Sequence, residues 1–226
     1  MVDTAPASKP TLGYWKIRGL ASQIRYEMVF LGLDFAEHQY EQGDAPDFDR
    51  SSWLNVKDTL GLQFPNLPYF LDGDLKLTET NAIMKYIAAK YGPDLLGKDP
   101  AQIAKVEMVS NVVGDLKGAV TMPCYTSGDR AAITANLMEK VKPIVAFLGD
   151  KPFLAGDNVT YVDFTFFELC DLMNWLSEGR LFAEQEKLAA YSGRMKELPK
   201  LKEFYADDEK CMKAPFNNKI AKLNNI

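Results

Sequence analysis

The sequence has a single histidine and only three cysteines among its 226 residues. One histidine argues against a His-based metal site or a Ser-His-Asp triad, and His38 lies in an alternating run that is typical of a strand. The cysteines are far apart and form no Cys-x-x-Cys pair, which argues against a disulfide scaffold or a redox dithiol. We therefore expect a protein of a reducing compartment, the cytoplasm, without a metal site; the cysteines are Cys124, Cys170 and Cys211.

A basic excess and long apolar runs are also missing. Lys and Arg number 26 against 31 Asp and Glu, which gives a formal charge of −5, and no basic stripe interrupts this balance. Binding to nucleic acid depends largely on such basic surfaces. No apolar run approaches the roughly 20 residues that a membrane span needs, and residues 1–9 lack the apolar core of a signal peptide. The sequence predicts neither a nucleic-acid nor a membrane partner, and a disordered extension over residues 1–9.

Residues 10–90 alternate strand and helix patterns. A short strand ends near Tyr14, a helix ends at Gly32, and residues 35–40 form a second strand. A turn-rich acidic surface loop over residues 43–51 leads into a helix-like segment. The strands 66–71 and 75–78 then flank Asp72-Gly73, a hairpin signal, and residues 80–90 form a helix. The order βαβαββα predicts an α/β, thioredoxin-like domain.

From residue 99 onward the patterns are helical, after a short Pro/Gly linker over residues 91–98. Asp99-Pro100 combines an N-cap residue with proline at the first helical position. Thr160 to Asp163 resembles a capping box that opens an apolar helix over residues 164–175. We expect an all-helical domain over residues 99–226, in which one apolar helix face is formed by Ile103, Val106, Val109, Val113 and Val120.

Tyr14 is the first candidate functional residue, because it lies at the carboxyl end of the opening strand and beside the start of a helix. Ligands of α/β proteins bind outside the carboxyl ends of the strands. A phenol at this place donates a strong hydrogen bond to an anion without ionising at neutral pH, since its ordinary pKa is ~10. We expect Tyr14 to face an anionic ligand.

Three further pairs in this domain have a binding interpretation and a simpler alternative. A cis bond at Leu67-Pro68 would leave the backbone of Leu67 open to an extended peptide, whereas an edge proline in the trans form would not. At a helix N-terminus, Thr80 with Glu79 could bind a carboxylate and an ammonium, or Thr80 could simply cap its own helix.

Trp53 and Lys57, four residues apart with Arg50 upstream, could hold a second carboxylate, or form a solvated amphipathic turn. With the other two pairs, they imply a peptide that has a carboxylate at each end.

The chain resembles the mu class of glutathione transferases from about residue 12 to residue 216. The motifs are Leu-Gly-Tyr-Trp-x-Ile-Arg-Gly-Leu, the insertion Gly-Asp-Ala-Pro-Asp-Phe-Asp-Arg-Ser followed by x-Trp-Leu-Asn, then Phe-Pro-Asn-Leu-Pro-Tyr and Thr-x-x-Asn-Ala-Ile. The insertion is specific to the mu class. The resemblance implies an enzyme that conjugates the thiolate of reduced glutathione, its co-substrate, to hydrophobic electrophiles in detoxification, with no permanently bound cofactor.

The resemblance also implies a role for individual residues. Tyr14 matches the catalytic tyrosine, Tyr125 a second tyrosine that assists some electrophiles, and Phe64 the aromatic key of a homodimer. Asp115 matches an aspartate that reaches the glutathione site from the second subunit. The remaining glutathione-binding positions are Trp15, Leu20, Arg50, Trp53, Lys57, Asn66, Leu67, Pro68, Glu79 and Thr80. The electrophile site would be lined by Trp15, Leu20, Gly114, Thr121, Tyr125 and Phe216.

The sequence departs from the class at four places. Glu79 stands where the class usually has glutamine, and Gly114 and Thr121 differ in size from the residues often found there. The final stretch, residues 217–226, does not resemble the class. Two other functions fit the same fold: a non-catalytic carrier of hydrophobic ligands and a structural module. The intact set of Tyr14, Leu67-Pro68 and Thr80 argues against the vestigial glutathione site that the carrier would have.

Overall fold

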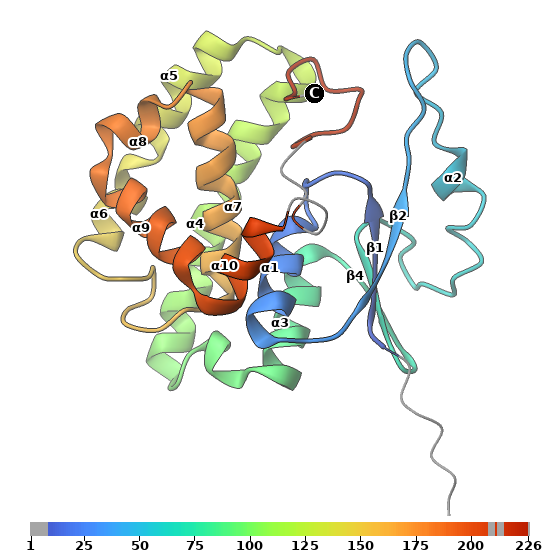
Figure 1. The fold of residues 1–226 in the computed structure, drawn as a ribbon, viewed down its shortest axis with the longest axis horizontal. Helices are drawn as coiled ribbons and strands as arrows, with labels where there is room; N and C mark the ends of the chain where they lie inside the picture. Colours follow the sequence, from blue (N-terminus) through green and yellow to red (C-terminus); the bar gives the residue numbers. More distant parts are fainter. Residues whose placement is uncertain (1–8, 208–210, 212–214, 226) are drawn as a thin grey trace, which may run out of the picture.

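The computed structural model describes residues 9–207, 211 and 215–225. All of the predicted N-terminal extension except Lys9 lies outside this part of the chain. Figure 1 shows a sheet on one side of the molecule and a larger helical body on the other, with α1 (Ser22–Leu31) and α3 (Thr80–Tyr91) between them. The short helix α2 (Ser51–Leu54) lies on the opposite face of the sheet.

The sheet has four strands in the order β2-β1-β3-β4. The strand β1 (Thr11–Trp15) pairs in parallel with β2 (Ala36–Tyr40), and Trp15 lies opposite Tyr40 at the carboxyl ends of both strands. The pairs of β1 with β3 (Tyr69–Asp72) and of β3 with β4 (Leu75–Thr78) are antiparallel. This mixed sheet and its helices confirm the predicted thioredoxin-like domain, and they bring the end of β1 to the edge that faces the helical domain.

Two details of the predicted hairpin differ. The strand β3 begins at Tyr69 rather than at residue 66, directly after Pro68, which has no N–H to donate to a ladder. The turn is Gly73-Asp74 rather than Asp72-Gly73, because Asp72 pairs with Leu75 within the ladder. Gly73 has φ +60°, and a two-residue turn with positive φ at its first residue is one of the favoured hairpin connections.

The second domain is helical, with the 3₁₀ helix η1 (Pro93–Leu96) between the domains. Asp99 accepts hydrogen bonds from the N–H groups of Ala101 and Gln102, as its predicted N-cap role requires. Thr160 and Asp163 form the predicted capping box. The helices are α4 (Pro100–Thr126), α5 (Arg130–Lys140), α6 (Lys142–Leu148), α7 (Tyr161–Leu176), α8 (Arg180–Glu184), α9 (Glu186–Glu197) and α10 (Pro199–Ala206).

The predicted apolar face of α4 is correct except at Ile103, which is 41% exposed. At 100° per residue, the other four positions cluster within about 60° around the helix, whereas Ile103 is rotated by about 90° from their centre. Those four are Val106, Val109, Val113 and Val120, all buried.

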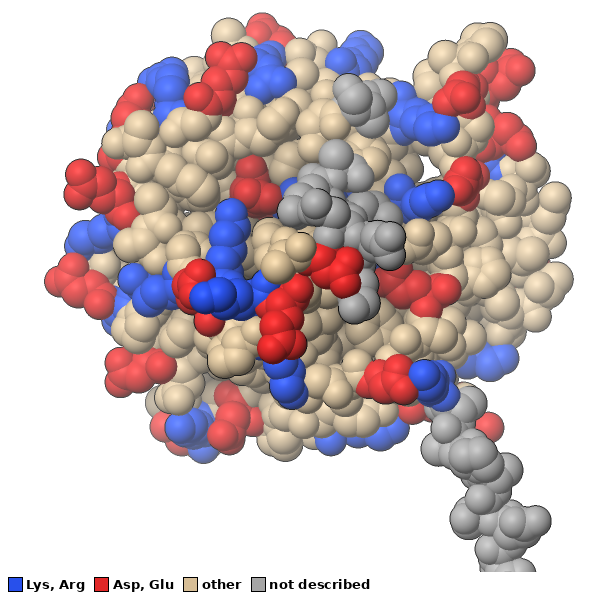
Figure 2. Space-filling model, viewed as in Figure 1, with Lys and Arg blue, Asp and Glu red and all other residues tan. Residues whose placement is uncertain are grey.

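On the face shown in Figure 2, acidic and basic side chains are interspersed with uncharged ones, and neither sign covers a continuous surface. The described helices include none that is long and apolar enough to cross a membrane.

Candidate active site

Tyr14 lies at the end of β1, with its ring buried and its hydroxyl at the turn that leads into α1. The backbone N–H of Leu20 donates a hydrogen bond of 3.0 Å to Tyr14 Oη. Gly19 has φ +44°, and a side-chain carbon at this position would lie 2.6 Å from Tyr14 Oη. The turn therefore needs glycine both for its conformation and for its close approach to the phenol.

Burial raises the pKa of Tyr14 to about 12, although the hydrogen bond from Leu20 opposes this shift. The phenol is therefore protonated at neutral pH. Because its oxygen already accepts from Leu20, its own proton remains available for donation to a ligand.

A cavity of about 190 Å³ opens beside this hydroxyl, between the two domains. Of the predicted electrophile-site residues, Leu20, Thr121, Tyr125 and Phe216 line it, together with Tyr14. Gly114 does not: it is exposed on α4, with open space around the position of a Cβ. The remaining lining residues are Gly19, Lys117, Glu168, Leu169, Leu172 and Asn217.

The C-terminal segment closes one side of this cavity, and of its residues only Phe216 was expected there. The N–H of Gly19 donates to the carbonyl of Phe216 at 3.0 Å. The N–H of Asn218 donates to Tyr125 Oη at 3.0 Å, and the N–H of Leu223 donates to the carbonyl of Cys124 at 3.1 Å. The segment is thus attached both to the Tyr14 turn and to the end of α4.

Trp15 lines a separate cavity of about 210 Å³, together with Ile17, Tyr40, Pro215 and Asn218. It belongs to the same edge of the sheet as Tyr14, but the two side chains face different cavities because successive residues of a strand point to opposite faces.

The Leu67-Pro68 bond is cis, so the alternative of a trans proline is wrong. The N–H of Leu67 donates to Oδ1 of its neighbour Asn66 at 2.9 Å. A peptide that pairs with this N–H must therefore displace the Asn66 side chain, which is exposed.

Glu79 has φ +70° and occupies the N-cap position of α3, and Thr80 is the first helical residue. The alternative that Thr80 caps its own helix is therefore wrong. Among the described residues, neither Glu79 nor another side chain caps this terminus, and the first N–H groups of an α-helix have no partner within the helix. A non-glycine residue with positive φ is uncommon and concentrates at functional sites.

Trp53 is buried and stacks on Tyr69 at 6.0 Å between ring centroids, so the alternative of a solvated turn is wrong for this residue. Lys57 follows one turn later, with its N–H bonded to the carbonyl of Trp53, and is partly buried. Arg50 is exposed at the N-terminus of α2. Asp115, on α4, and Phe64, 70% exposed before β3, both face solvent in the single chain.

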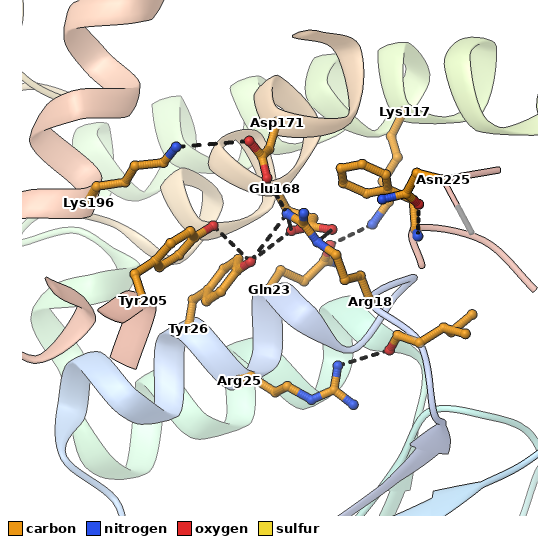
Figure 3. Close-up of polar contacts among 12 residues, drawn as sticks. Arg18, Gln23, Arg25, Tyr26, Lys117, Glu168, Asp171, Lys196, Tyr205 and Asn225 are labelled. Carbon is orange, nitrogen blue, oxygen red and sulfur yellow. Dashed lines mark hydrogen bonds and ion pairs between the residues drawn. The ribbon is translucent and has the colours of Figure 1, made fainter. Parts of the chain in front are cut away.

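Sequence reasoning missed a buried ionic cluster between the domains (Figure 3). The guanidinium of Arg18 donates to both carboxylate oxygens of Glu168, at 3.0 and 2.6 Å, and lies 2.7 Å from Asp171. Tyr26 donates to Glu168 at 3.0 Å and contacts the hydroxyl of Tyr205 at 3.1 Å. The cluster joins the Tyr14 turn and α1 to α7 and α10.

Lys117 was not predicted from the sequence either, although its helical spacing from Thr121 and Tyr125 indicated a shared face. Lys117, Thr121 and Tyr125 are successive positions at i, i+4 and i+8 on α4, so they share one helix face. All three line the cavity next to Tyr14. Among the described residues, no group of three or more His, Cys, Asp or Glu side chains could hold a metal ion.

Comparison with known proteins identifies the family. The model of the glutathione S-transferase N-terminal domain matches residues 10–89, and that of the C-terminal domain matches residues 119–208. A glutathione S-transferase of Dermatophagoides pteronyssinus is 38% identical over 221 residues, which are 96% of this chain and 98% of the relative. Glutathione S-transferase Mu 1 of Bos taurus is 38% identical over 95% of this chain and 98% of its own length.

Among solved structures, the glutathione S-transferase Blo t 8 superposes with a TM-score of 0.85 at 32% identity, covering 95% of this chain and all of the other. A pi-class enzyme of Onchocerca volvulus, 24% identical with a TM-score of 0.82, shares the fold. Sequence similarity over nearly the whole length, both family domains and the observed architecture agree: the chain belongs to the glutathione S-transferase family, as a mu-class-like transferase that uses glutathione as its co-substrate.

Proposed function

We propose that Tyr14 activates glutathione by donating its hydroxyl proton as a hydrogen bond to the thiolate sulfur. The observation that carries this proposal is the hydrogen bond from the Leu20 N–H to Tyr14 Oη, which occupies the phenol as an acceptor and leaves it as a donor. The raised pKa of Tyr14, about 12, supports a donor rather than a base.

The free energy needed to stabilise the thiolate of glutathione is small. A thiol with a pKa of ~8.5 is only ~3% ionised at pH 7. Lowering this pKa by ~2 units makes the thiolate the main form and requires about 2.7 kcal/mol of differential stabilisation. One charge-assisted hydrogen bond supplies about 1.5–3 kcal/mol, and the nearby helix N-terminus favours the same anion.

The tripeptide would extend from Tyr14 across the sheet edge. In this proposal the backbone of Leu67, before Pro68, pairs with the cysteinyl residue after Asn66 has moved. Thr80 and Glu79 hold the γ-glutamyl end, at an α3 N-terminus that has no side-chain cap. The glycyl carboxylate is held by Trp53 and Lys57, and further contacts come from Trp15, Leu20, Arg50 and the partner's copy of Asp115.

The hydrophobic electrophile would occupy the cavity beside Tyr14. Leu20, Leu169, Leu172 and Phe216 supply apolar walls, and Tyr125 supplies a hydroxyl. The thiolate attacks an electrophilic carbon held against this surface. We assign residues 10–90 to glutathione, residues 91–98 to the linker and residues 99–226 to the electrophile, in a cytoplasmic enzyme.

We further propose a homodimer. Phe64 is 70% exposed, and Met108, Val112 and Met122 of α4 are 53%, 44% and 63% exposed. Asp115 shares that face of α4, because positions 108, 112, 115 and 122 follow helical spacing. Such exposed apolar side chains are typical of an interface. Phe64→Glu is expected to shift the sedimentation coefficient to that of the monomer, whereas unchanged association would contradict the interface.

The proposed function is tested with Tyr14→Phe. We expect the wild type to bind immobilised glutathione and to conjugate 1-chloro-2,4-dinitrobenzene, and the variant to bind but to lose about 100-fold in kcat/KM, the equivalent of ~2.7 kcal/mol. Retention without turnover in the wild type would favour a ligand carrier, and loss of both would favour a structural module. Wild-type turnover by Tyr14→Phe would overturn the role of Tyr14.

A further inference from the structure

Lys117 places a cation in the apolar cavity. Its side chain leaves α4 and reaches between the domains, where Nζ donates a hydrogen bond of 2.5 Å to Oε1 of Gln23 on α1 (Figure 3). An ammonium has three donors. The bond to Gln23 uses one of them, and the residue lines the cavity next to Tyr14.

This ammonium has no counter-charge in direct contact. In residues 9–207, 211 and 215–225, no carboxylate forms an ion pair with Lys117. The carboxylate that shares the cavity, Glu168, is already bonded to Arg18 and to the hydroxyl of Tyr26. Burial consequently lowers the pKa of Lys117 to about 8, an effect that the charge of Glu168 opposes. A cation in such surroundings gains from an anionic partner.

The hydroxyl of Thr121 is a second polar group in this cavity that a polar ligand would satisfy. Oγ1 of Thr121 is buried and has no hydrogen-bond partner among the described atoms. It lies one helical turn beyond Lys117 and one turn before Tyr125. These neighbours can donate hydrogen bonds to a bound molecule, whereas the walls around them are mainly apolar, formed by Leu20, Leu169, Leu172 and Phe216.

We propose that this cavity selects electrophiles that carry a carboxylate, and that Lys117 and Thr121 bind this carboxylate. The inference rests on the proposed function, because it takes the cavity beside Tyr14 as the electrophile site. Lys117 is then a specificity-determining residue, and the apolar walls hold the hydrocarbon part of the same molecule.

A matched pair of aryl chlorides tests the charge: 4-chloro-3-nitrobenzoate and its methyl ester. In both, the glutathione thiolate forms a carbon–sulfur bond at the ring carbon that bears chlorine, and chloride leaves with the electron pair of the carbon–chlorine bond. The substrates differ only in the charged group. The readout is the kcat/KM of the acid divided by that of the ester, so any effect of a variant on the shared thiolate cancels.

Lys117→Met keeps an unbranched side chain that is one atom shorter, and removes the charge. We expect the acid-to-ester ratio to fall by about tenfold to 100-fold, the range of a hydrogen bond to a charged group, mainly through KM. Thr121→Val is expected to lower the ratio by about threefold. Lys117→Arg, which keeps the charge, should retain a higher ratio than Lys117→Met. The matched control is Lys105→Met, an exposed lysine of the same helix, which should keep the wild-type ratio.

A ratio that Lys117→Met leaves unchanged would overturn the inference. A binding measurement distinguishes this outcome from a failure of the proposed function. Calorimetric titration with S-(4-carboxy-2-nitrophenyl)glutathione and its methyl ester needs no turnover, and Lys117→Met should lower the affinity ratio of this pair by the same factor. If the wild type conjugates neither substrate but the affinity ratio falls as expected, the proposed function fails and the carboxylate site stands.

Discussion

Tyr14 and Lys117 face one cavity from different domains, and burial changes both pKa values in favour of the uncharged form. The pKa of Tyr14 rises to about 12, and that of Lys117 falls to about 8. At neutral pH the phenol is a neutral donor, whereas Lys117 is still mainly protonated. The same physical effect therefore yields a hydrogen-bond donor on the side proposed for glutathione and an unneutralised cation on the side proposed for the electrophile.

The buried ionic cluster around Arg18 and Glu168 joins the two regions. Breaking this cluster is expected to have the largest effect on the protein. Arg18 and Glu168 are 3% and 5% exposed, so Arg18→Met would leave a buried carboxylate without its cation. We expect the free energy of unfolding to fall by about 3–5 kcal/mol in urea titrations. Arg180→Met, which breaks the exposed pair with Glu184, is the matched control and should change it by about 0.5 kcal/mol or less. Equal effects would contradict the cluster's role.

Gly19→Ala acts first on the Tyr14 side of the cavity, because the three atoms nearest to the added carbon all belong to Tyr14. The added methyl group would lie 2.6 Å from Tyr14 Oη at a positive φ. Displacement of a catalytic group by about 1 Å lowers rates by up to about 100-fold, so we expect kcat to fall by at least tenfold. Gly73→Ala also has positive φ but meets no atom within 4 Å, and should lose about 1 kcal/mol of stability with no change in kcat. Similar kcat values for the two variants would show that the phenol tolerates displacement.

Glu27 lies at neither side of the cavity, and its effect depends on pH and is smallest near pH 4. It is fully buried on α1, its carboxylate oxygens have no hydrogen-bond partner in the described part of the chain, and burial raises its pKa well above the ordinary value. Above pH ~4 the unfolded chain releases this proton while the folded chain keeps it. Stability therefore falls by about 1.4 kcal/mol per pH unit from this group until the folded-state pKa is reached.

Glu27→Gln replaces the titrating carboxyl group with a neutral amide, so position 27 no longer contributes to the pH dependence of stability. We expect its stability relative to the wild type to increase from pH 4 to pH 7 in urea titrations at each pH. Parallel curves for the two proteins would show that Glu27 is ionised in the folded state.

The glutathione side was predictable because its signals are local. Tyr14 follows a strand, Leu67-Pro68 precedes one, and Thr80 begins a helix, so short stretches of sequence predicted their positions. The hairpin turn was misplaced by one residue, since Asp72-Gly73 and Gly73-Asp74 both satisfy turn chemistry.

The electrophile side depends on packing between distant segments. The carbonyl of Phe216 accepts a hydrogen bond from the backbone N–H of Gly19, which lies almost 200 residues earlier in the sequence. Glu168 likewise accepts a hydrogen bond from the distant Arg18. Composition and periodicity do not encode such contacts. Gly114 was expected in the cavity, but the structure has it on the exposed face of α4.

We propose that the Tyr14 hydroxyl stabilises the glutathione thiolate. Thiolate absorbance near 240 nm, measured against pH for the glutathione complexes of wild type and Tyr14→Phe, tests it most directly. We expect the thiol to titrate about 2 pH units below its ordinary pKa of ~8.5 in the wild type, and near 8.5 in the variant. The same thiol pKa in both proteins would contradict the account.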